Sequence, residues 1–248
     1  MKKLLEISCY SVASAVIAEE GGAGRVELCA ARPEGGTTPS PAAITLARKR
    51  LHIPLYVIIR PRGGDFLYSD LEFEEMKRDI LFCKEAGVDG IVSGVLRSDG
   101  TVDTERTGEL LALARPLGFT FHRAFDMTRD PFEALDALIA LGVDRVLTSG
   151  QEATAVEGQA LIRRLIEKAG DRITIFPGGD LNEENLEAFA RYTGAKEYHA
   201  AAGHLVRGGM TFRNPKVLMG GMEGIPEYDI WEVDIRKVRK MAEILAHL

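Results

Sequence analysis

Strand-like and helix-like segments alternate strictly along this 248-residue chain, and this order limits the possible folds more than any other feature. Eight short apolar runs are predicted strands: 4–9, 25–30, 55–60, 90–95, 119–122, 145–148, 173–176 and 197–200. Seven segments between them carry apolar residues at three- and four-residue steps, as helices on a core do: 12–20, 41–51, 71–86, 103–114, 131–141, 155–169 and 183–192. The alternation predicts parallel strands joined by outer helices, and eight such units close a barrel.

A doubly wound open sheet is the alternative fold for alternating strands and helices. Its first turn would be expected to carry a glycine fingerprint that holds a dinucleotide. The first turn here is Cys9-Tyr10-Ser11-Val12, which lacks that fingerprint. We therefore predict an α/β fold with a single (β/α)8 TIM-type barrel over residues 1–203.

Residues 204–248 form a predicted C-terminal extension. Val238, Met241, Leu245 and Leu248 line one face of a helix near its end. The extension is therefore expected either to complete the outer ring of the barrel or to pack on a partner subunit.

The composition is that of a soluble globular protein, with 46% hydrophobic residues, 27% charged residues and a formal net charge of −6. With 31 basic and 37 acidic residues, the chain has no general attraction for nucleic acid. No apolar stretch approaches the roughly 18 residues that a membrane span needs, so no membrane partner is expected. Three cysteines are an odd number for a disulfide framework, which favours a reducing cytoplasm.

Polar residues gather where the predicted strands end, and in barrels this rim carries the chemistry. Glu6, Glu27, His122 and Asp126 form a candidate acid–base cluster there. One interpretation is that the buried charges only fix the barrel register, since buried charges must be paired whatever their purpose. The other is that His122 titrates near neutrality and acts as acid, base or ligand.

Two arginines follow the third strand in the run Arg60-Pro61-Arg62-Gly63-Gly64. Two guanidiniums beside flexible glycines suit the capture of a carboxylate or a phosphate. Gly178 and Gly179 follow the seventh strand, where barrels commonly bind phosphate. These four residues are the candidate anion-binding site, and a surface turn with salt bridges is the alternative for the arginine run.

Several longer motifs resemble the CutC family. They are Val26-Glu27-Leu28-Cys29, Glu34-Gly35-Gly36-Thr37-Thr38-Pro39-Ser40, Arg60-Pro61-Arg62-Gly63-Gly64-Asp65-Phe66, Tyr68-Ser69-Asp70, His122-Arg123-Ala124-Phe125-Asp126, Leu147-Thr148-Ser149-Gly150-Gln151 and Phe212-Arg213-Asn214. The resemblance spans nearly the whole chain. It implies a TIM-type barrel, a cytoplasmic location, frequent homo-oligomerisation and a role in copper homeostasis, but no settled enzymatic activity.

For some members the resemblance implies copper(I) binding through cysteine, and Cu(I) is a soft ion that favours thiolates. Cys29 and Cys9 are the candidate metal ligands in this chain. Many relatives have cysteine at the position of Ser8, where this chain has no thiol. Strand alternation also directs Cys9 toward the helices. For Cys9 a small buried apolar role is favoured over a ligand role.

Two functions therefore remain open at the level of sequence. The first is a copper homeostasis protein that binds Cu(I) through Cys29, with or without Cys9. The second is an enzyme of unknown specificity that acts on a small anionic or phosphorylated metabolite. A barrel fold does not decide between them.

Overall fold

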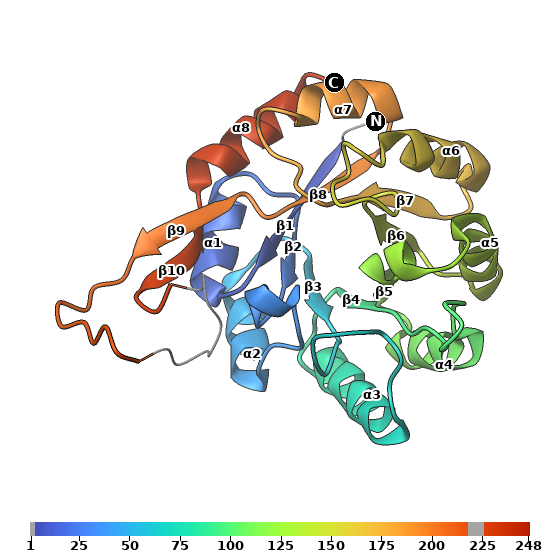
Figure 1. Ribbon diagram of the computed structural model, residues 1–248, viewed down its shortest axis with the longest axis horizontal. Helices are drawn as coiled ribbons and strands as arrows, with labels where there is room; N and C mark the ends of the chain where they lie inside the picture. Colours follow the sequence, from blue (N-terminus) through green and yellow to red (C-terminus); the bar gives the residue numbers. More distant parts are fainter. Residues whose placement is uncertain (1–2, 218–225) are drawn as a thin grey trace.

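Eight parallel strands form the wall of a barrel, and helices surround it (Figure 1). The structure is a computed structural model that describes residues 3–217 and 226–248. The barrel strands are β1 (Leu4–Cys9), β2 (Arg25–Leu28), β3 (Leu55–Ile58), β4 (Gly90–Ser93), β5 (Gly118–Phe121), β6 (Arg145–Thr148), β7 (Thr174–Pro177) and β8 (Glu197–Ala200). The helices are α1 (Val12–Glu20), α2 (Pro41–Arg50), α3 (Asp70–Glu85), α4 (Thr104–Ala114), α5 (Pro131–Leu141), α6 (Gln159–Ala169), α7 (Leu186–Thr193) and α8 (Ile235–Ala246).

Each strand pairs with its neighbours in sequence, in the order β7-β6-β5-β4-β3-β2-β1-β8. A parallel bridge between Gly178 and His199 joins β7 to β8 and closes the ring. The predicted (β/α)8 barrel is thereby confirmed. Two 3₁₀ turns, η1 (Arg32–Glu34) and η2 (Arg123–Met127), follow β2 and β5 at the end of the barrel where the strands terminate.

Alternation along the strands separates an apolar outer face from a polar inner face. On β1 and β2, the side chains of Ile7, Val26 and Leu28 are buried in the core beneath the helices. Glu6 and Glu27 lie on the opposite face, inside the barrel, because successive strand side chains point to opposite sides. The larger hydrophobic core is therefore the layer between strands and helices. The inside of the barrel holds the charged groups beside a smaller apolar cluster of Cys29, Tyr56, Ile58 and Val92.

Most element boundaries agree with the sequence within two residues. The seventh helix, predicted from residue 183, begins at Leu186, and the sixth helix differs more. It was predicted from residue 155 and begins at Gln159. The backbone N–H of Ala155 instead donates to the carbonyl of Gly179 at 2.8 Å, and Gly158 packs against Gly150. The start of this segment is thus held by the loop after β7 rather than by helical hydrogen bonds.

The C-terminal extension contains a two-stranded antiparallel sheet and a helix. The sheet consists of β9 (Gly203–Arg207) and β10 (Asp229–Val233), and it projects from the barrel (Figure 1). Helix α8 lies against α1, α7 and β1, with Val238, Met241 and Leu245 buried. Helix α8 therefore packs beside α1 and α7 on the outside of the strands. Among the described helices, none combines the length and apolar character needed to cross a membrane.

Candidate functional site

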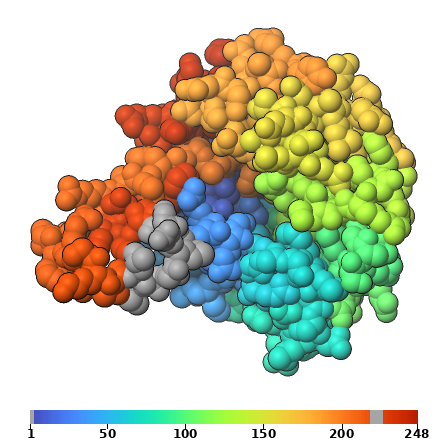
Figure 2. All heavy atoms as spheres, in the orientation of Figure 1, coloured from blue at the N-terminus to red at the C-terminus, as the bar shows by residue number. Residues whose placement is uncertain are grey.

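A pocket of about 250 Å³ opens at the end of the barrel where the strands terminate. Its walls come from β1, β2, β3, β6 and β8 and from the loops after β5 and β7. Figure 2 shows this face of the molecule hollowed near its centre. In barrels of this type active sites occupy this end, so the position agrees with the rim proposed from the sequence.

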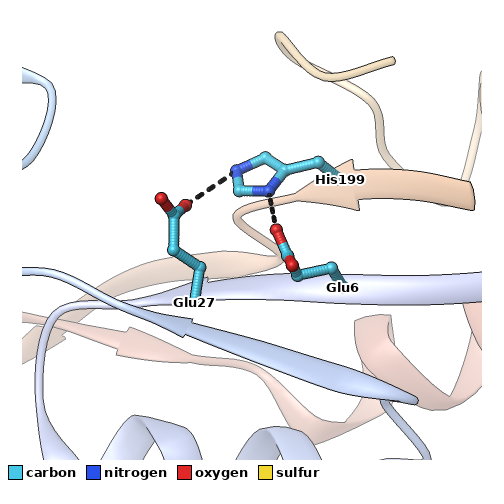
Figure 3. A group of neighbouring side chains, drawn as sticks. All are labelled: Glu6, Glu27 and His199. Carbon is cyan, nitrogen blue, oxygen red and sulfur yellow. Dashed lines mark hydrogen bonds and ion pairs between the residues drawn. The ribbon is translucent and has the colours of Figure 1, made fainter. Parts of the chain in front are cut away.

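Two carboxylates flank one imidazole on the first, second and eighth strands (Figure 3). Strand register brings them together, because Glu6 lies opposite His199 and Ser8 lies opposite Glu27. The His199 Nδ1 atom is 2.8 Å from Glu6 Oε1, and His199 Nε2 is 3.7 Å from Glu27 Oε2. Glu6 therefore holds the ring on one side and directs its other nitrogen toward Glu27.

Glu6 is held in place by a group of charged side chains inside the barrel, namely Arg25, Glu197 and Arg145. The Arg25 guanidinium bonds Glu6 Oε2, and it also donates to Glu197 at 2.8 Å. Arg145 donates to the same Glu197 oxygen at 3.0 Å. The rings of Tyr56 and Phe176 lie near the Arg25 guanidinium at 4.8 and 4.9 Å. Glu6 is thus paired and immobilised, whereas the ion pair recorded for Glu27 among the described residues is the longer one to His199 Nε2, at 3.7 Å.

The surroundings of the two glutamates drive their pKa values apart. Burial alone would raise the pKa of Glu6, but Arg25 and the hydrogen bond with His199 outweigh it and lower that pKa to about 2. Burial raises the pKa of Glu27 to about 7, although His199 opposes the shift. Burial would lower the pKa of His199, but Glu6 and Glu27 outweigh it and raise that pKa above its usual value. Separated acidities of this kind are typical of acid–base sites.

The set of two carboxylates and one histidine also has the composition of a cation site. One potential ligand atom from each residue lies within 4.8 Å of the others. Glu6, however, already uses both of its carboxylate oxygens on Arg25 and His199. The geometry as it stands favours an acid–base arrangement over three metal ligands, with Glu6 hydrogen-bonded to His199 Nδ1 and Glu27 3.7 Å from His199 Nε2.

His122 lies on another wall of the pocket, after β5. Its ring is buried, and its Nδ1 atom accepts a hydrogen bond from the Ala124 N–H at 3.2 Å. Burial, assisted by the nearby charge of Arg60, lowers the pKa of His122 to about 3. His122 is therefore a neutral ring at physiological pH. Its proposed acid–base role stays a prediction, and Glu6 and Glu27 contact His199 in its place.

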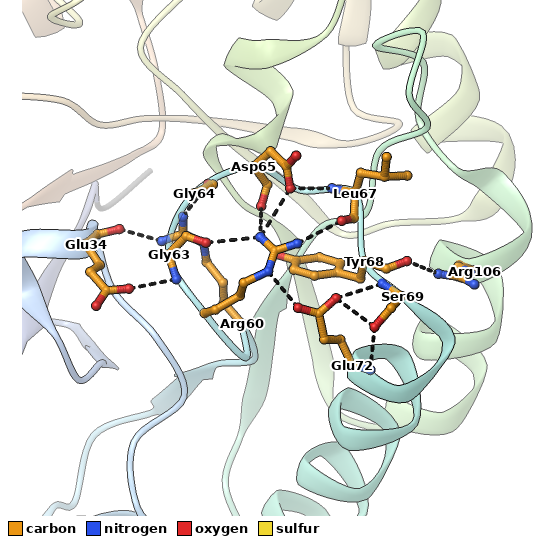
Figure 4. A network of polar contacts seen from close by, with 11 residues as sticks. Glu34, Arg60, Gly63, Gly64, Asp65, Leu67, Tyr68, Ser69, Glu72 and Arg106 are labelled. Carbon is orange, nitrogen blue, oxygen red and sulfur yellow. Dashed lines mark hydrogen bonds and ion pairs between the residues drawn. The ribbon is translucent and has the colours of Figure 1, made fainter.

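Arg60 and Arg62 lie in different environments, and Figure 4 shows Arg60 in the loop with Gly63 and Gly64. Arg60 lines the pocket, and its two terminal nitrogens donate to the carbonyls of Glu34, Gly36 and Gly64 at 2.6–2.9 Å. Arg62 lies outside the pocket lining and bonds Glu72 at 2.6 Å. Arg62 thus fastens its own loop to α3, whereas Arg60 presents positive charge at the pocket without a carboxylate partner in the described part of the chain.

The carboxylate of Asp126 joins the turn after β5 to the residues that follow β6. It accepts hydrogen bonds from Arg123 Nε at 2.7 Å and from the Ser149 N–H at 3.0 Å. It also accepts bonds from Thr148 Oγ1 and the Gln151 N–H. Arg123 lines the pocket, so Asp126 positions a cationic side chain there rather than lining the pocket itself.

The two candidate copper ligands lie on different faces of the sheet. Cys29 lines the pocket, and Cys9 is buried among the apolar side chains under the helices. Burial raises the pKa of both thiols well above the usual value. The arrangement therefore offers the pocket one thiol, from Cys29, and does not support a clasp formed by both.

The two glycines after β7 have different roles. Gly178 donates its N–H to Thr148 at 3.0 Å and forms the bridge to His199. Gly179 lines the pocket with φ +122°, and a Cβ there would lie 3.0 Å from that of Ser149. A side chain at position 179 would therefore be strained and crowded.

Unusual backbone conformations also concentrate at this rim. Within the described residues, the non-glycine positions with positive φ are Ala31, Gln151, Asp180 and Ala202. They follow β2, β6, β7 and β8 by two or three residues. Backbone strain of this kind gathers at functional sites, which supports a functional role for this end of the barrel.

Sequence reasoning missed His199 as a site residue, although it placed this histidine on the eighth strand. The available signal was alternation: Glu197, His199 and Ala201 share one face, and Glu197 and His199 are polar. The pairing of His199 with Glu6 could not be anticipated, because it depends on how the first strand meets the last.

Comparison with known proteins gives consistent results. The model of the CutC family matches residues 3–204. The chain is 48% identical to the human copper homeostasis protein cutC homolog over 99% of this chain and 90% of the human protein. It is 50% identical to a family protein CutC of Chromobacterium violaceum, over 99% of each chain. The CutC crystal structure from Streptococcus agalactiae aligns with a TM-score of 0.77 and 37% identity, over 80% of this chain and 98% of that one. These similarities confirm the resemblance seen in the motifs, and the chain belongs to the CutC family of copper homeostasis proteins.

Proposed function

We propose that the pocket performs general acid–base chemistry on a small anionic molecule. The observation that carries the proposal is the chain Glu6–His199–Glu27. Glu6 accepts a hydrogen bond from Nδ1 and thereby directs His199 Nε2 toward Glu27. A carboxylate behind an imidazole is a common device for orienting a catalytic histidine.

The charge of the buried group supports the transfer of one proton. Three carboxylates, on Glu6, Glu27 and Glu197, share the interior with the guanidiniums of Arg25 and Arg145. One proton, placed on His199 or on Glu27, makes the whole group neutral. That proton lies at the pocket end of the network, where a ligand can receive it.

Positive charge elsewhere on the rim favours an anionic ligand. Arg60 and Arg123 both line the pocket, and Arg123 Nη1 makes no hydrogen bond within the described residues. Arginine is well suited to hold carboxylate and phosphate oxygens. We infer that Arg60, Arg123 and the backbone at Gly179 hold the ligand while His199 and Glu27 exchange a proton with it.

The test begins with a thermal-shift screen of small phosphorylated sugars and of hydroxy and oxo acids. Each stabilising compound is then incubated with catalytic amounts of protein and followed by NMR. Glu27→Gln and His199→Gln should each lower turnover by about 100- to 10,000-fold while the compound still binds. Glu187→Gln, on the exposed surface of α7, is the matched control. Unchanged turnover in both pocket variants would refute the proposal.

A second function, the binding of Cu(I) as cargo, is favoured by the position of Cys29. Its thiol lines the pocket, and relatives of this chain are named copper homeostasis proteins. A thiolate fits the soft Cu(I) ion, and its binding must release the thiol proton because burial raises the pKa of Cys29. Competition with a Cu(I) chelator measures the affinity. Cys29→Ser should abolish binding and Cys9→Ser should leave it intact; equal affinities in wild type and Cys29→Ser would exclude this function.

We further infer a reducing, cytoplasmic location. The described cysteines, Cys9, Cys29 and Cys83, are all free and buried. Free thiols without disulfides are usual in reducing compartments. Subcellular fractionation of a tagged chain tests this expectation.

We also infer that the chain forms a homo-oligomer through the β9–β10 hairpin. A two-stranded sheet is marginally stable by itself and leaves both of its edges unpaired. Phe212 and Ile230, in or near this hairpin, expose 73% and 60% of their surfaces. A second copy of the chain would cover these apolar side chains.

A further inference from the structure

His122 faces the acid–base residues from across the barrel. Glu6, Glu27 and His199 come from the adjacent strands β1, β2 and β8, whereas His122 follows β5. In an eight-stranded ring β5 is the strand farthest from β1. Glu27, His199 and His122 all line the pocket, so a ligand there would lie between His122 and the other two.

The contacts of His122 determine which nitrogen carries its proton. Nδ1 accepts the N–H of Ala124 at 3.2 Å, so the proton of the neutral ring is on Nε2. Nε2 is buried and has no hydrogen-bond partner among the described residues. Buried donors are nearly always satisfied in folded proteins, so one left unpaired beside a pocket indicates an acceptor on the ligand.

The ring is held in place by apolar and backbone groups. Phe66 stacks at a tilt with its ring centre 5.0 Å from that of His122, and Phe121 lies 6.2 Å away. A Cβ on Gly94 would lie 2.8 Å from His122 Nδ1, which shows how closely the backbone just after β4 approaches the ring. The Nε2–H donor is therefore oriented in advance, in surroundings of low polarity where a hydrogen bond is strong.

We propose that the Nε2–H of His122 binds the carbonyl oxygen of the substrate, which is a small carbonyl compound with a hydrogen on the adjacent carbon. The assignment deepens the proposed acid–base function and depends on it. A single neutral N–H donor suits one carbonyl oxygen, whereas the cationic groups Arg60 and Arg123 suit the anionic part of the same molecule.

The resulting step is a proton transfer that needs no further reactant. The Glu27 carboxylate takes the proton from the carbon next to the carbonyl group. The C–H electron pair forms a C=C bond, and the π pair of the carbonyl moves onto oxygen, where the His122 N–H stabilises it. Return of the proton to the same carbon gives exchange or epimerisation, and its delivery elsewhere on the enolate gives an isomer.

The first test needs no substrate. In protein labelled with ¹⁵N-histidine, long-range ¹H–¹⁵N spectra at pH 6 should show His122 as the neutral Nε2–H tautomer. A charged ring, or a proton on Nδ1, would overturn the proposal.

The second test uses matched probes in D₂O: dihydroxyacetone phosphate against glycerol 3-phosphate, and 2-oxobutyrate against 2-hydroxybutyrate. At least one carbonyl probe should shift the His122 Nε2 signal and lose the protons next to its carbonyl group, while its alcohol partner does neither. If neither carbonyl probe shows the shift and the exchange, the proposal fails.

Variants separate this inference from the proposed function. His122→Leu should slow exchange of the carbonyl probe by about 100-fold or more, as loss of one oxyanion donor does. His122→Gln restores an amide N–H near the Nε2 position and should recover at least part of the rate, and the exposed His52→Gln is the control. Equal rates in His122→Leu and wild type, with turnover still lost in Glu27→Gln, would refute the carbonyl assignment and leave the acid–base function standing. Turnover unaffected by Glu27→Gln and His199→Gln would refute both.

Discussion

Glu6 and Glu27 are buried side chains on neighbouring strands. The surroundings of Glu6 favour its charged form, whereas those of Glu27 disfavour its charged form. Glu6 is paired with Arg25 and His199 at close range, whereas Glu27 has no arginine partner among the described residues and lies 3.7 Å from His199 Nε2. Glu6→Gln should lower the free energy of unfolding by about 3–5 kcal/mol, because it removes a partner from the buried Arg25 charge. Glu27→Gln should leave stability unchanged or increase it at pH 8. Urea unfolding of both variants at pH 8 measures the contrast.

The pH dependence of the unfolding free energy provides the control for this comparison of Glu6→Gln with Glu27→Gln. The folded pKa of Glu27 is about 7, above the value of 4.5 expected for an unfolded chain. A raised carboxyl pKa means that the unfolded chain releases its proton first, so wild type loses stability as pH rises from about 4.5 to 7. Glu27→Gln lacks this loss and should approach wild-type stability at pH 4.5. A Glu6→Gln variant as stable as Glu27→Gln at pH 8 would contradict the assigned pairing.

His122 has the opposite linkage, because burial lowers its pKa to about 3 from a usual value of 6.5. The unfolded chain therefore takes up a proton below pH 6.5 that the folded chain refuses, and stability is lost as pH falls toward 3. His122→Gln should escape this loss, so its stability relative to wild type should rise by about 1.4 kcal/mol per pH unit below 6.5. Denaturant unfolding at pH 7, 6 and 5 measures the trend. Parallel curves for the two proteins would show that His122 titrates normally.

Substitutions in α8 measure whether the C-terminal extension contributes to the stability of the barrel. Met241 is fully buried in this helix and its neighbour Lys240 is exposed. Met241→Ala should lower the free energy of unfolding by about 2–5 kcal/mol, since it leaves a cavity beneath the helix. Lys240→Ala, the matched change, should alter it by less than about 0.5 kcal/mol. Equal effects would mean that α8 does not pack on the strands in solution.

The strands and helices could be predicted because their apolar periods differ and each period repeats over several residues. Alternation likewise placed Glu6 and Glu27 on one face of neighbouring strands. Arg62 could not be placed this way, since it follows β3 in a loop whose path is set by its bonds to Glu72 and to backbone carbonyls. The predicted start of α6 was wrong for a similar reason, because the Ala155 N–H donates a hydrogen bond to the carbonyl of Gly179, in the loop after β7. Local pattern therefore predicted the elements, and long-range contacts decided the details of the rim.

Closure of the barrel into a ring brings the residues of the candidate site together. Glu6 on the first strand meets His199 on the last, and the arginines that balance the buried carboxylates come from β2 and β6. No single element contains the buried charged group. Its members come together only because the first and last strands, β1 and β8, pair in the closed ring.

The hairpin of β9 and β10 lies outside this closed ring, and we expect it to mediate self-association of the chain. Phe212 and Ile230 expose large apolar surfaces on or beside it, and patches of that kind commonly mark contacts between proteins. Light scattering after size exclusion should therefore give wild type a mass of at least twice the 27.1 kDa chain. The double change Phe212→Ser and Ile230→Ser should shift it to the single-chain mass, because it removes the apolar area that a second copy would bury. Leu71→Ser, an exposed position on α3, should leave the assembly unchanged. A wild-type mass of 27.1 kDa would show that the hairpin has no partner of its own kind.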